Sequence, residues 1–330
     1  MVKRVSVLVA VYNCAEWLPR CLDSLCAQTH PDVEVICVND ASRDGSLAII
    51  EEYASKYSFI KYISNESNCG PAVSRNKAFG ISTGDYITMV DSDDWLSPDA
   101  LERAVEQLDN NNDTASVLFR MVYYDADTGH EHDFPSKFGG DVIDGAEAMR
   151  LALDWDIHGL YVARRSLYEK YPFDTSSLLY SDDTTARRHY LHSGKVRFCE
   201  GVYYYFQHGN STLHNPGIRY ADWMEATASL KRMLVEESQP DEYINHIETR
   251  LWLNIVAVGG YYCRYGHTLA PQQRASVYER IKRHHAAVEY HRLPSALKRK
   301  FGFIPFRRSF ALFMLQARLY FFLRKIIKGI

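Results

Sequence analysis

Two carboxylates spaced two residues apart follow a short apolar segment of the chain. Asp91 and Asp93 come directly after residues 86–90, a run that predicts a buried strand. In extended backbone, side chains two residues apart leave the same face, so both carboxylates can point at one ligand. Oxygen ligands of this kind suit Mn²⁺ or Mg²⁺, with water and substrate phosphates completing the shell. The alternative is an acidic turn before a helix, with Ser97 as N-cap and Pro98 at the first helical position.

Three earlier apolar segments also precede polar loops. Residues 5–11, 33–38 and 59–63 each predict a buried strand; the first ends at Tyr12 and the second at Asp40. Segments with helical periodicity separate them. Because strand and helix alternate with short connections, we expect a parallel sheet with right-handed crossovers. Ligands of such sheets bind beyond the carboxyl ends of the strands, so these loops should converge on one crevice.

Side chains around this crevice suit a nucleoside diphosphate. Asp40 can accept a hydrogen bond from a nucleobase N–H group, and Asp93 can hold a metal ion under a diphosphate. Arg75, one turn into a helix that begins near Pro71, can bind phosphate through two guanidinium nitrogens. The alternative for Arg75 is a solvated helix face.

Four segments carry a family resemblance in their order and spacing: residues 7–13 (VLVAVYN), 38–46 (VNDASRDGS), 68–76 (NCGPAVSRN) and 83–96 (TGDYITMVDSDDWL). Together they resemble the inverting family 2 glycosyltransferases. The resemblance implies a GT-A fold, a Rossmann-like and mostly parallel twisted sheet flanked by helices. Two positions depart from the family pattern: Ala10 stands where a proline is usual, and Asn39 replaces the first residue of an Asp-Asp pair.

The resemblance also implies a nucleotide-sugar donor, with a UDP-sugar favoured. Asp40 would read the base, and Asp93 would bind the metal ion. That ion would neutralise the charge of the departing nucleoside diphosphate. Asp91 would contact the ribose or sugar, or share the metal. The expected donor-binding residues are Ala10, Tyr12, Asn13, Asp40, Gly70, Arg75, Asp91 and Ser92.

A second pair of acids lies in the later half of the chain. The family carries a Glu-Asp pair at this position, whose aspartate is the general base, and here the pair is Asp182-Asp183. By resemblance Asp183 takes this role, with Asp182 as the alternative. A sugar hydroxyl is a poor nucleophile, so a carboxylate within hydrogen-bond reach must accept its proton. Attack opposite the diphosphate inverts the anomeric centre. Without catalysis, the same acids would cap the helix that follows.

Histidines supply further candidate ligands. His208 follows an aromatic strand expected over residues 202–206, in a loop that in the family often folds over the diphosphate, so it is a weaker candidate for metal or phosphate. His130 and His132 also have metal-ligand spacing, but a surface hairpin is the favoured interpretation. Residues 113–145 lack periodicity and predict loops that form an acceptor-side wall.

The last forty residues differ in charge from the rest of the chain. Residues 291–330 hold ten Lys or Arg and no acid; because the whole chain carries −3, residues 1–290 carry −13. On a helical wheel, Arg307, Arg318 and Lys325 form a cationic stripe, with Lys328 nearby, beside an aromatic and aliphatic face. This pattern is typical of a helix lying on an anionic membrane surface. Packing on the body or in a homodimer is the alternative.

These features predict a domain organisation: a GT-A catalytic domain over residues 1–215, with a nucleotide-binding half (1–112) and an acceptor half (113–215), then a helical extension over 216–330. The composition, 46% hydrophobic and 24% charged, is that of a globular protein. No segment reaches the length of a transmembrane helix. The seven cysteines form no Cys-x-x-Cys pair and lie mostly in apolar stretches, which favours reduced thiols in a cytoplasmic protein.

The predicted function is therefore that of a metal-dependent, inverting glycosyltransferase. By resemblance to bacterial members of the family, its acceptor would be a saccharide, lipid-linked, in capsule, O-antigen or lipooligosaccharide synthesis. It would work peripherally at the inner face of the cell membrane, and the net charge gives no reason to expect a nucleic-acid partner. One alternative is a non-catalytic nucleotide-sugar-binding module. A sugar nucleotidyltransferase would need a glycine-rich phosphate loop after the first strand, and residues 12–15 (YNCA) are not one.

Overall fold

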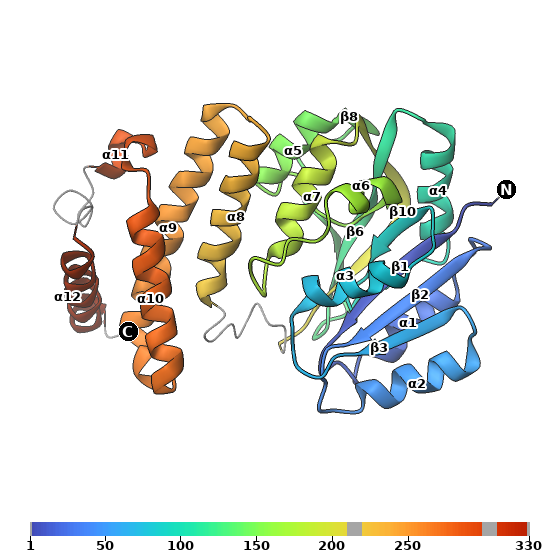
Figure 1. The fold of residues 1–330 in the computed structure, drawn as a ribbon, viewed down its shortest axis with the longest axis horizontal. Coiled ribbons are helices and arrows are strands. Elements are labelled where there is room, and N and C mark those ends of the chain that lie inside the picture. Colours follow the sequence, from blue (N-terminus) through green and yellow to red (C-terminus); the bar gives the residue numbers. More distant parts are fainter. Residues whose placement is uncertain (1, 210–219, 299–308, 329–330) are drawn as a thin grey trace. The chain divides into compact units, whose positions relative to one another are not determined.

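The computed structural model describes residues 2–209, 220–298 and 309–328. The chain divides into two compact units, Met1–His214 and Asn215–Ile330. The first is a mixed α/β unit built on one sheet, and the second is helical (Figure 1). Each unit is described by itself below.

The first half of the sheet is parallel, as the sequence predicts. Its strand order is β3-β2-β1-β4, and each neighbouring pair runs in the same direction. The strands are β1 (Val5–Val11), β2 (Val33–Asn39), β3 (Ile60–Ser64) and β4 (Tyr86–Met89), and the intervening helices are α1 (Leu18–Cys26), α2 (Ser46–Lys56) and α3 (Pro71–Ile81). Since β1 pairs with β2 and β4, the loops that end these three strands lie at one edge of the sheet.

The second half of the sheet is mixed in direction. β9 runs antiparallel to both β4 and β6, whereas β10 runs parallel to β6 and antiparallel to β5. The strands here are β5 (Trp95–Leu96), β6 (Thr114–Asp125), β7 (Glu131–Asp133), β8 (Val142–Asp144), β9 (Tyr161–Arg164) and β10 (Lys195–Gln207). The helices are α4 (Ala100–Asn110), α5 (Gly145–Leu153), α6 (Arg165–Lys170) and α7 (Ser181–Leu191).

Two sequence predictions for this half are wrong. Residues 113–145 are not mainly loops, because β6 is a twelve-residue strand whose Val117, Leu118 and Phe119 are fully buried. Ser97 is also not the cap of the next helix. The helix α4 begins at Ala100 with Asp99 as N-cap, and the Ala100 N–H donates to the Ser97 carbonyl in the turn before it. The expected surface hairpin is present, since β7, which holds His132, pairs with β6.

The second unit is a helical bundle with its own apolar core. Its helices are α8 (Asp222–Glu236), α9 (Asp241–Tyr265), η2 (Gly266–Thr268), α10 (Pro271–Ala287), η3 (Tyr290–Arg292), α11 (Ser295–Lys298) and α12 (Phe310–Lys328). The helix α12 buries Phe313 and Met314 in this core, where the Phe313 ring lies 5.8 Å from that of Trp252 on α9. Its Leu315 and Leu319 are exposed.

The expected cationic stripe of this last helix is only partly described. Arg307 and the side chains of Lys325 and Lys328 lie outside the described residues. Within the described ranges, no helix is both long enough and apolar enough to cross a membrane. The seven cysteines are unpaired, and burial raises the pKa of Cys14, Cys37 and Cys199 to about 12, so these three are unreactive thiols.

Candidate active site

The acidic loop after β4 is fixed to the end of β10 by buried hydrogen bonds. The Tyr203 hydroxyl accepts from the Asp91 N–H at 3.1 Å and donates to Asp94 Oδ2 at 2.8 Å. The Phe206 N–H donates to Asp94 Oδ1 at 2.7 Å. Asp94 is 2% exposed; its burial raises the pKa of this carboxyl well above the usual range, and the charges of Asp93 and Asp91 add to the effect. Asp94 thus positions the loop, while Asp91 and Asp93 remain partly accessible.

Asp93 and His208 come together although 115 residues separate them in the chain. His208 Nε2 lies 3.0 Å from Asp93 Oδ2. The imidazole ring packs on Trp17, with ring centroids 4.0 Å apart, and on Phe206 at 5.2 Å. Its Nδ1 is buried and has no hydrogen-bond partner in the described part of the chain. The structure therefore places two of the predicted metal ligands side by side.

These side chains fit a divalent cation that shares its shell with a substrate. No cluster of three or more His, Cys, Asp or Glu side chains suitable for a metal occurs among the described residues. A carboxylate and an imidazole suit Mn²⁺, and Mg²⁺ in phosphate-transfer sites is commonly bound by only one or two carboxylates plus substrate phosphates and water. The chemistry of Asp93 and His208 is compatible with such a site, with phosphate oxygens supplying what the protein does not.

Asp91 forms a salt bridge with Arg75, which is buried in α3. Arg75 is 3% exposed, so it does not lie on a solvated helix face. Burial opposes the charge of this guanidinium, but Asp91 and Asp182 outweigh the burial and raise the pKa of Arg75. Burial also raises the pKa of Asp91. The positive charge of Arg75 acts to lower this pKa, whereas the negative charges of Asp93 and Asp182 raise it further. Arg75 Nε has no hydrogen-bond partner among the described residues.

Asp40 anchors the loop between β3 and α3. Its Oδ1 accepts from the Asn65 side chain at 2.8 Å and from the Cys69 N–H at 2.9 Å, and its Oδ2 accepts from the Gly70 N–H at 2.8 Å. Gly70 has φ of 88°, and a Cβ there would lie 2.8 Å from Leu178 Cδ2, so this position requires glycine. An ionised carboxylate has about four lone-pair sites. With three used, Asp40 retains about one for a ligand N–H.

The other expected donor-binding residues lie at the ends of β1 and β4. Ala10 is half-buried in β1, Tyr12 is exposed, and Ser92 is buried in the acidic loop. Asn13 has φ of 50°, and its N–H donates to the Ser42 hydroxyl at 3.1 Å. Its Oδ1 accepts from the N–H of Arg43, which follows Ser42 in the loop after β2, at 2.8 Å. The two loops that follow β1 and β2 are therefore cross-linked at the strand ends.

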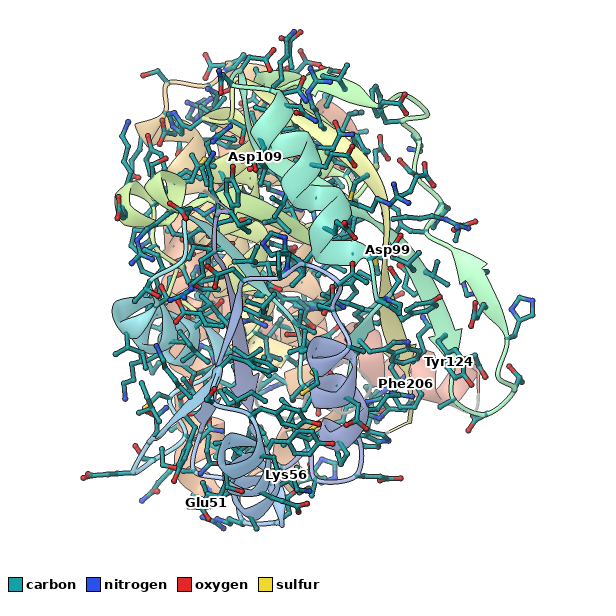
Figure 2. All side chains as sticks on the ribbon, turned by 90° about the vertical axis from the view of Figure 1, so that its right-hand side faces the viewer. Glu51, Lys56, Asp99, Asp109, Tyr124 and Phe206 are labelled. Carbon is teal, nitrogen blue, oxygen red and sulfur yellow. The ribbon has the colours of Figure 1, made fainter. Side chains whose placement is uncertain are left out.

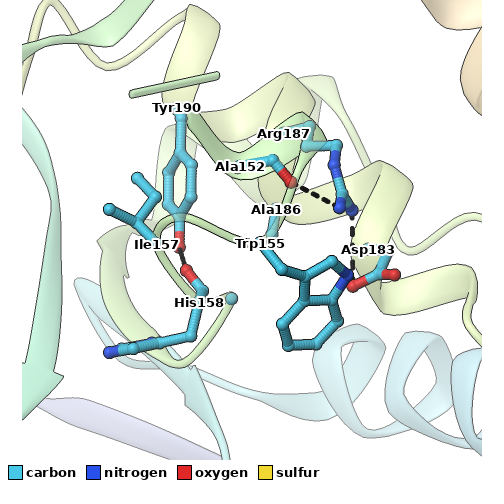
Figure 3. Close-up of a pocket in the computed structure, with 9 residues that line it drawn as sticks. Ala152, Trp155, Ile157, His158, Asp183, Ala186, Arg187 and Tyr190 are labelled. Carbon is cyan, nitrogen blue, oxygen red and sulfur yellow. Dashed lines mark hydrogen bonds and ion pairs between the residues drawn. The ribbon is translucent and has the colours of Figure 1, made fainter. Parts of the chain in front are cut away.

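Asp182 and Asp183 begin α7 but have different neighbours. Asp182 lies close enough to Arg75 and Asp91 to influence the pKa of both. Asp183 Oδ1 is 3.3 Å from Arg187 Nη1, and Arg187 Nη2 donates to the Ala152 carbonyl at 2.6 Å (Figure 3). Neither acid is the helix N-cap, which is Tyr180; both lie in the first turn, where negative charge is favourable.

Sequence reasoning missed Arg20 of α1. Its guanidinium lies between the rings of Trp95, at 3.8 Å, and Phe206, at 3.9 Å, and its Nη2 donates to the Asp93 carbonyl at 2.9 Å. Phe206 also packs against Tyr124 at the end of β6, with ring centroids 6.0 Å apart (Figure 2). In the sequence Arg20 is a polar position on an amphipathic helix. Only the fold reveals that aromatic residues from β5 and β10 surround it.

The fold and the family model agree on the class of this protein. The unit has the GT-A fold, a mixed α/β sheet flanked by helices, with acidic side chains at the strand ends. The model described as glycosyl transferase family 2 matches residues 6–171. The chain therefore belongs to glycosyl transferase family 2.

Curated relatives support this assignment, and solved structures support the fold. The glycosyltransferase GlyA of Streptococcus pneumoniae is 30% identical over 235 residues, which cover 68% of this chain and 33% of the relative. A poly(ribitol-phosphate) beta-glucosyltransferase of Bacillus spizizenii is 44% identical over 103 residues, 30% of this chain and 16% of the relative. The chain thus matches a third or less of the length of these two relatives.

Among solved structures, that of S. aureus TarS 1-349 has a TM-score of 0.66 at 18% identity, covering 99% of this chain and 92% of that one. The same protein in complex with UDP-GlcNAc has a TM-score of 0.68 at 18% identity, covering 96% and 89%. At this identity the similarity defines the fold and not the substrate.

Proposed function

We propose that this family 2 glycosyltransferase transfers a sugar from a UDP-sugar to a saccharide acceptor with inversion at the anomeric carbon. The observation that carries the proposal is that Asp40 and the acidic loop follow β2 and β4, which both pair with β1. In that loop Asp91 pairs with Arg75 of α3, and His208 lies beside Asp93. Support for the donor comes from the UDP-GlcNAc complex of TarS, whose fold is similar.

Each donor-site residue has a role that fits its surroundings. Asp40, with about one lone pair left, accepts from the uracil N–H, and Arg75, whose Nε has no hydrogen-bond partner among the described residues, binds phosphate or ribose beside Asp91. Asp93, with His208, would hold Mn²⁺ or Mg²⁺, which would supply charge neutralisation for the departing diphosphate. Asp91, which is paired with Arg75, would contact the ribose or sugar.

Asp183 is the proposed general base, with Asp182 as the alternative. Asp183 is 24% exposed at the start of α7, where it can accept a proton from an acceptor hydroxyl. Asp182 interacts electrostatically with Arg75 and Asp91 and so lies towards the donor residues. Consecutive residues of one helical turn would then separate the two tasks, Asp183 serving the acceptor and Asp182 the donor side.

The proposed acceptor is lipid-linked and belongs to a surface polysaccharide. Its support is the basic, acid-free segment of residues 291–330 and the exposed apolar side chains of α12. One curated relative, similar over 30% of this chain, is named as a glucosyltransferase of a polymer, poly(ribitol-phosphate). The enzyme would then act while bound peripherally to the cytoplasmic face of the membrane.

The test is nucleoside diphosphate release from UDP-, GDP- and dTDP-sugars, with and without Mn²⁺, followed by NMR assignment of the anomeric configuration of the product. The variants are Asp93→Ala, Asp183→Asn and Asp182→Asn, with Asp127→Asn as control because that carboxylate is exposed in the β6–β7 turn. We expect Mn²⁺-dependent release from one UDP-sugar. Loss of a general base typically lowers kcat by about 10²–10⁴-fold, which we expect for Asp183→Asn.

Three outcomes would change the assignment. A full loss in Asp182→Asn with near-normal Asp183→Asn would transfer the role of base to Asp182. Turnover that is indifferent to chelation would remove the metal from the mechanism. Donor binding without turnover, even with lipid-linked acceptors present, would indicate a nucleotide-sugar-binding module.

A further inference from the structure

The helix α5 ends in a backbone motif that normally uses glycine, but here the residue is tryptophan. The Asp156 N–H donates to the Leu151 carbonyl at 3.1 Å, and the Trp155 N–H donates to the Ala152 carbonyl at 3.2 Å. These two bonds form a Schellman motif, whose left-handed position is usually glycine or asparagine. Trp155 occupies that position with φ of 61°.

A bulky side chain in this conformation is strained, so it needs a compensating gain. Complete burial of the indole ring would supply one, but Trp155 remains 43% exposed. Residues held in strained backbone conformations cluster at active sites and ligand clamps. The strain and the exposure together indicate a binding role for the indole.

The indole lies at the mouth of a recess beside the proposed base. The recess is narrow, with a volume of about 10 Å³ open to a water-sized group, and it is lined by Trp155, His158, Gly159, Asp183, Arg187 and Tyr190, among others (Figure 3). It has room for a single hydroxyl group, and the exposed indole beside it offers a flat apolar surface next to polar groups.

Arg187 supplies a second, independent indication of a ligand. Its side chain is 3% exposed, yet it lines the recess and lies beside Asp183. Its Nη2 donates to the Ala152 carbonyl, whereas its Nε has no hydrogen-bond partner in the part of the chain that the structure describes. A buried guanidinium nitrogen without a partner is costly, and a ligand oxygen would remove that cost.

We propose that Trp155, Arg187 and Asp183 form the subsite for the acceptor sugar, and that this sugar is a pyranose. The inference rests on the proposed glycosyltransferase function. The C–H face of a pyranose ring would stack on the indole, whose π face is electron-rich. Arg187 and Asp183 would then bind hydroxyl groups at the ring edge, which brings one hydroxyl to the proposed base. An open-chain polyol phosphate has no such flat face and would bind poorly.

The experiment compares Trp155→Phe, which keeps a flat ring, with Trp155→Leu, which keeps apolar volume only. Tyr57→Leu is the matched control, because Tyr57 is a similarly exposed aromatic residue that does not line the recess. Transfer from the active UDP-sugar is measured to methyl pyranosides of glucose, galactose and N-acetylglucosamine, and to ribitol 5-phosphate. UDP affinity is measured by calorimetry, and Tm by thermal unfolding.

We expect Trp155→Leu to raise KM for the preferred pyranoside about tenfold, the upper end of an aromatic stacking contribution, with kcat within about threefold of wild type. Trp155→Phe should recover most of the affinity. UDP affinity should stay within about twofold of wild type, and the two Trp155 variants should have similar Tm values. Ribitol 5-phosphate should be a poor acceptor.

Equal KM values for the Phe and Leu variants, with normal donor turnover, would overturn the subsite but not the glycosyltransferase function. A KM effect that follows a fall in Tm, or a preference for ribitol 5-phosphate, would also overturn it. Wild-type protein that neither binds UDP nor turns over any UDP-sugar would overturn the proposed function itself and the subsite with it.

Discussion

The buried hydroxyl group of Tyr203 helps to hold the acidic loop in shape. Tyr203 is completely buried, and its hydroxyl is the acceptor for the Asp91 N–H and the donor to Asp94. Three aspartates within four residues repel one another, so an unconstrained loop would move them apart. The hydroxyl of Tyr203 and the Phe206 N–H fix Asp94 and so oppose this repulsion. Asp91 and Asp93, which precede Asp94 in the same loop, are thereby held in place.

We expect Tyr203→Phe to lower the free energy of unfolding by about 1–3 kcal/mol, because the Asp91 N–H and Asp94 Oδ2 lose a buried partner. UDP affinity should fall in parallel. The control is Tyr86→Phe, whose hydroxyl contacts Lys3 and Asp109, both about 40% exposed and so open to water. Urea denaturation measures the free energy of unfolding of both variants. Equal losses in the two variants would contradict a special role for the Tyr203 hydroxyl.

At the scale of the element, α7 is held against the sheet by a histidine that must be neutral. His189 is fully buried; its Nε2 lies 2.7 Å from the Tyr171 carbonyl and its Nδ1 lies 2.7 Å from the Tyr161 hydroxyl. A carbonyl only accepts, so Nε2 carries the proton and Nδ1 accepts from Tyr161. Burial lowers the pKa of His189 to about 4; the Tyr171 carbonyl opposes this, and His192 and Arg188 add to the lowering. Burial also lowers the pKa of His158 to about 4.

These depressed pKa values predict acid sensitivity of the first unit. Between pH 6.5 and about 4 the unfolded chain binds a proton at His189 and the folded chain does not, so stability falls as pH falls through this window. Each such histidine contributes a slope of up to about 1.4 kcal/mol per pH unit. The measurement is the free energy of unfolding at pH 7, 6, 5 and 4.5 for wild type and His189→Gln.

The variant should be less stable at pH 7 but show a shallower slope below pH 6. His132→Gln, on the exposed strand β7, is the control for removing a histidine. Parallel pH profiles for wild type and His189→Gln would contradict a neutral, acid-sensitive His189.

Sequence patterns predicted those elements whose burial is decided locally. Residues 5–11 and 33–38 are apolar throughout, so β1 and β2 could be predicted with near-correct ends. β6 was missed because Asn- and Asp-rich segments surround it, and because it pairs with β9 and β10 from much later in the chain. The contact of Asp93 with His208, the packing of Arg20 on aromatic rings and the burial of Arg187 depend on such pairings, which no local pattern contains.

At the scale of the whole molecule, an acidic body is joined to a basic C-terminal segment. The ten cations of residues 291–330 face no acid within that segment. α12 uses Phe313 and Met314 for its own packing, and it leaves Leu315, Leu319 and Phe322 at least half exposed. Exposed apolar side chains on a cationic helix contribute to binding at an anionic bilayer through both burial and charge.

The membrane proposal therefore predicts weaker binding to anionic vesicles for the triple variant Leu315→Gln, Leu319→Gln, Phe322→Gln. This variant leaves the packing residues Phe313 and Met314 in place. Wild type should sediment with phosphatidylglycerol vesicles and not with phosphatidylcholine vesicles, and the triple variant should bind at least about tenfold more weakly. The control is Leu253→Gln, Val256→Gln, which removes exposed apolar side chains from α9. Undiminished vesicle binding by the triple variant would contradict the proposal.

The same variant also tests the homodimer alternative. If wild type is dimeric and the triple variant is monomeric with unchanged lipid binding, this face of α12 is a homodimer interface. A twofold interface requires a self-complementary face, and an apolar face of this kind meets that requirement.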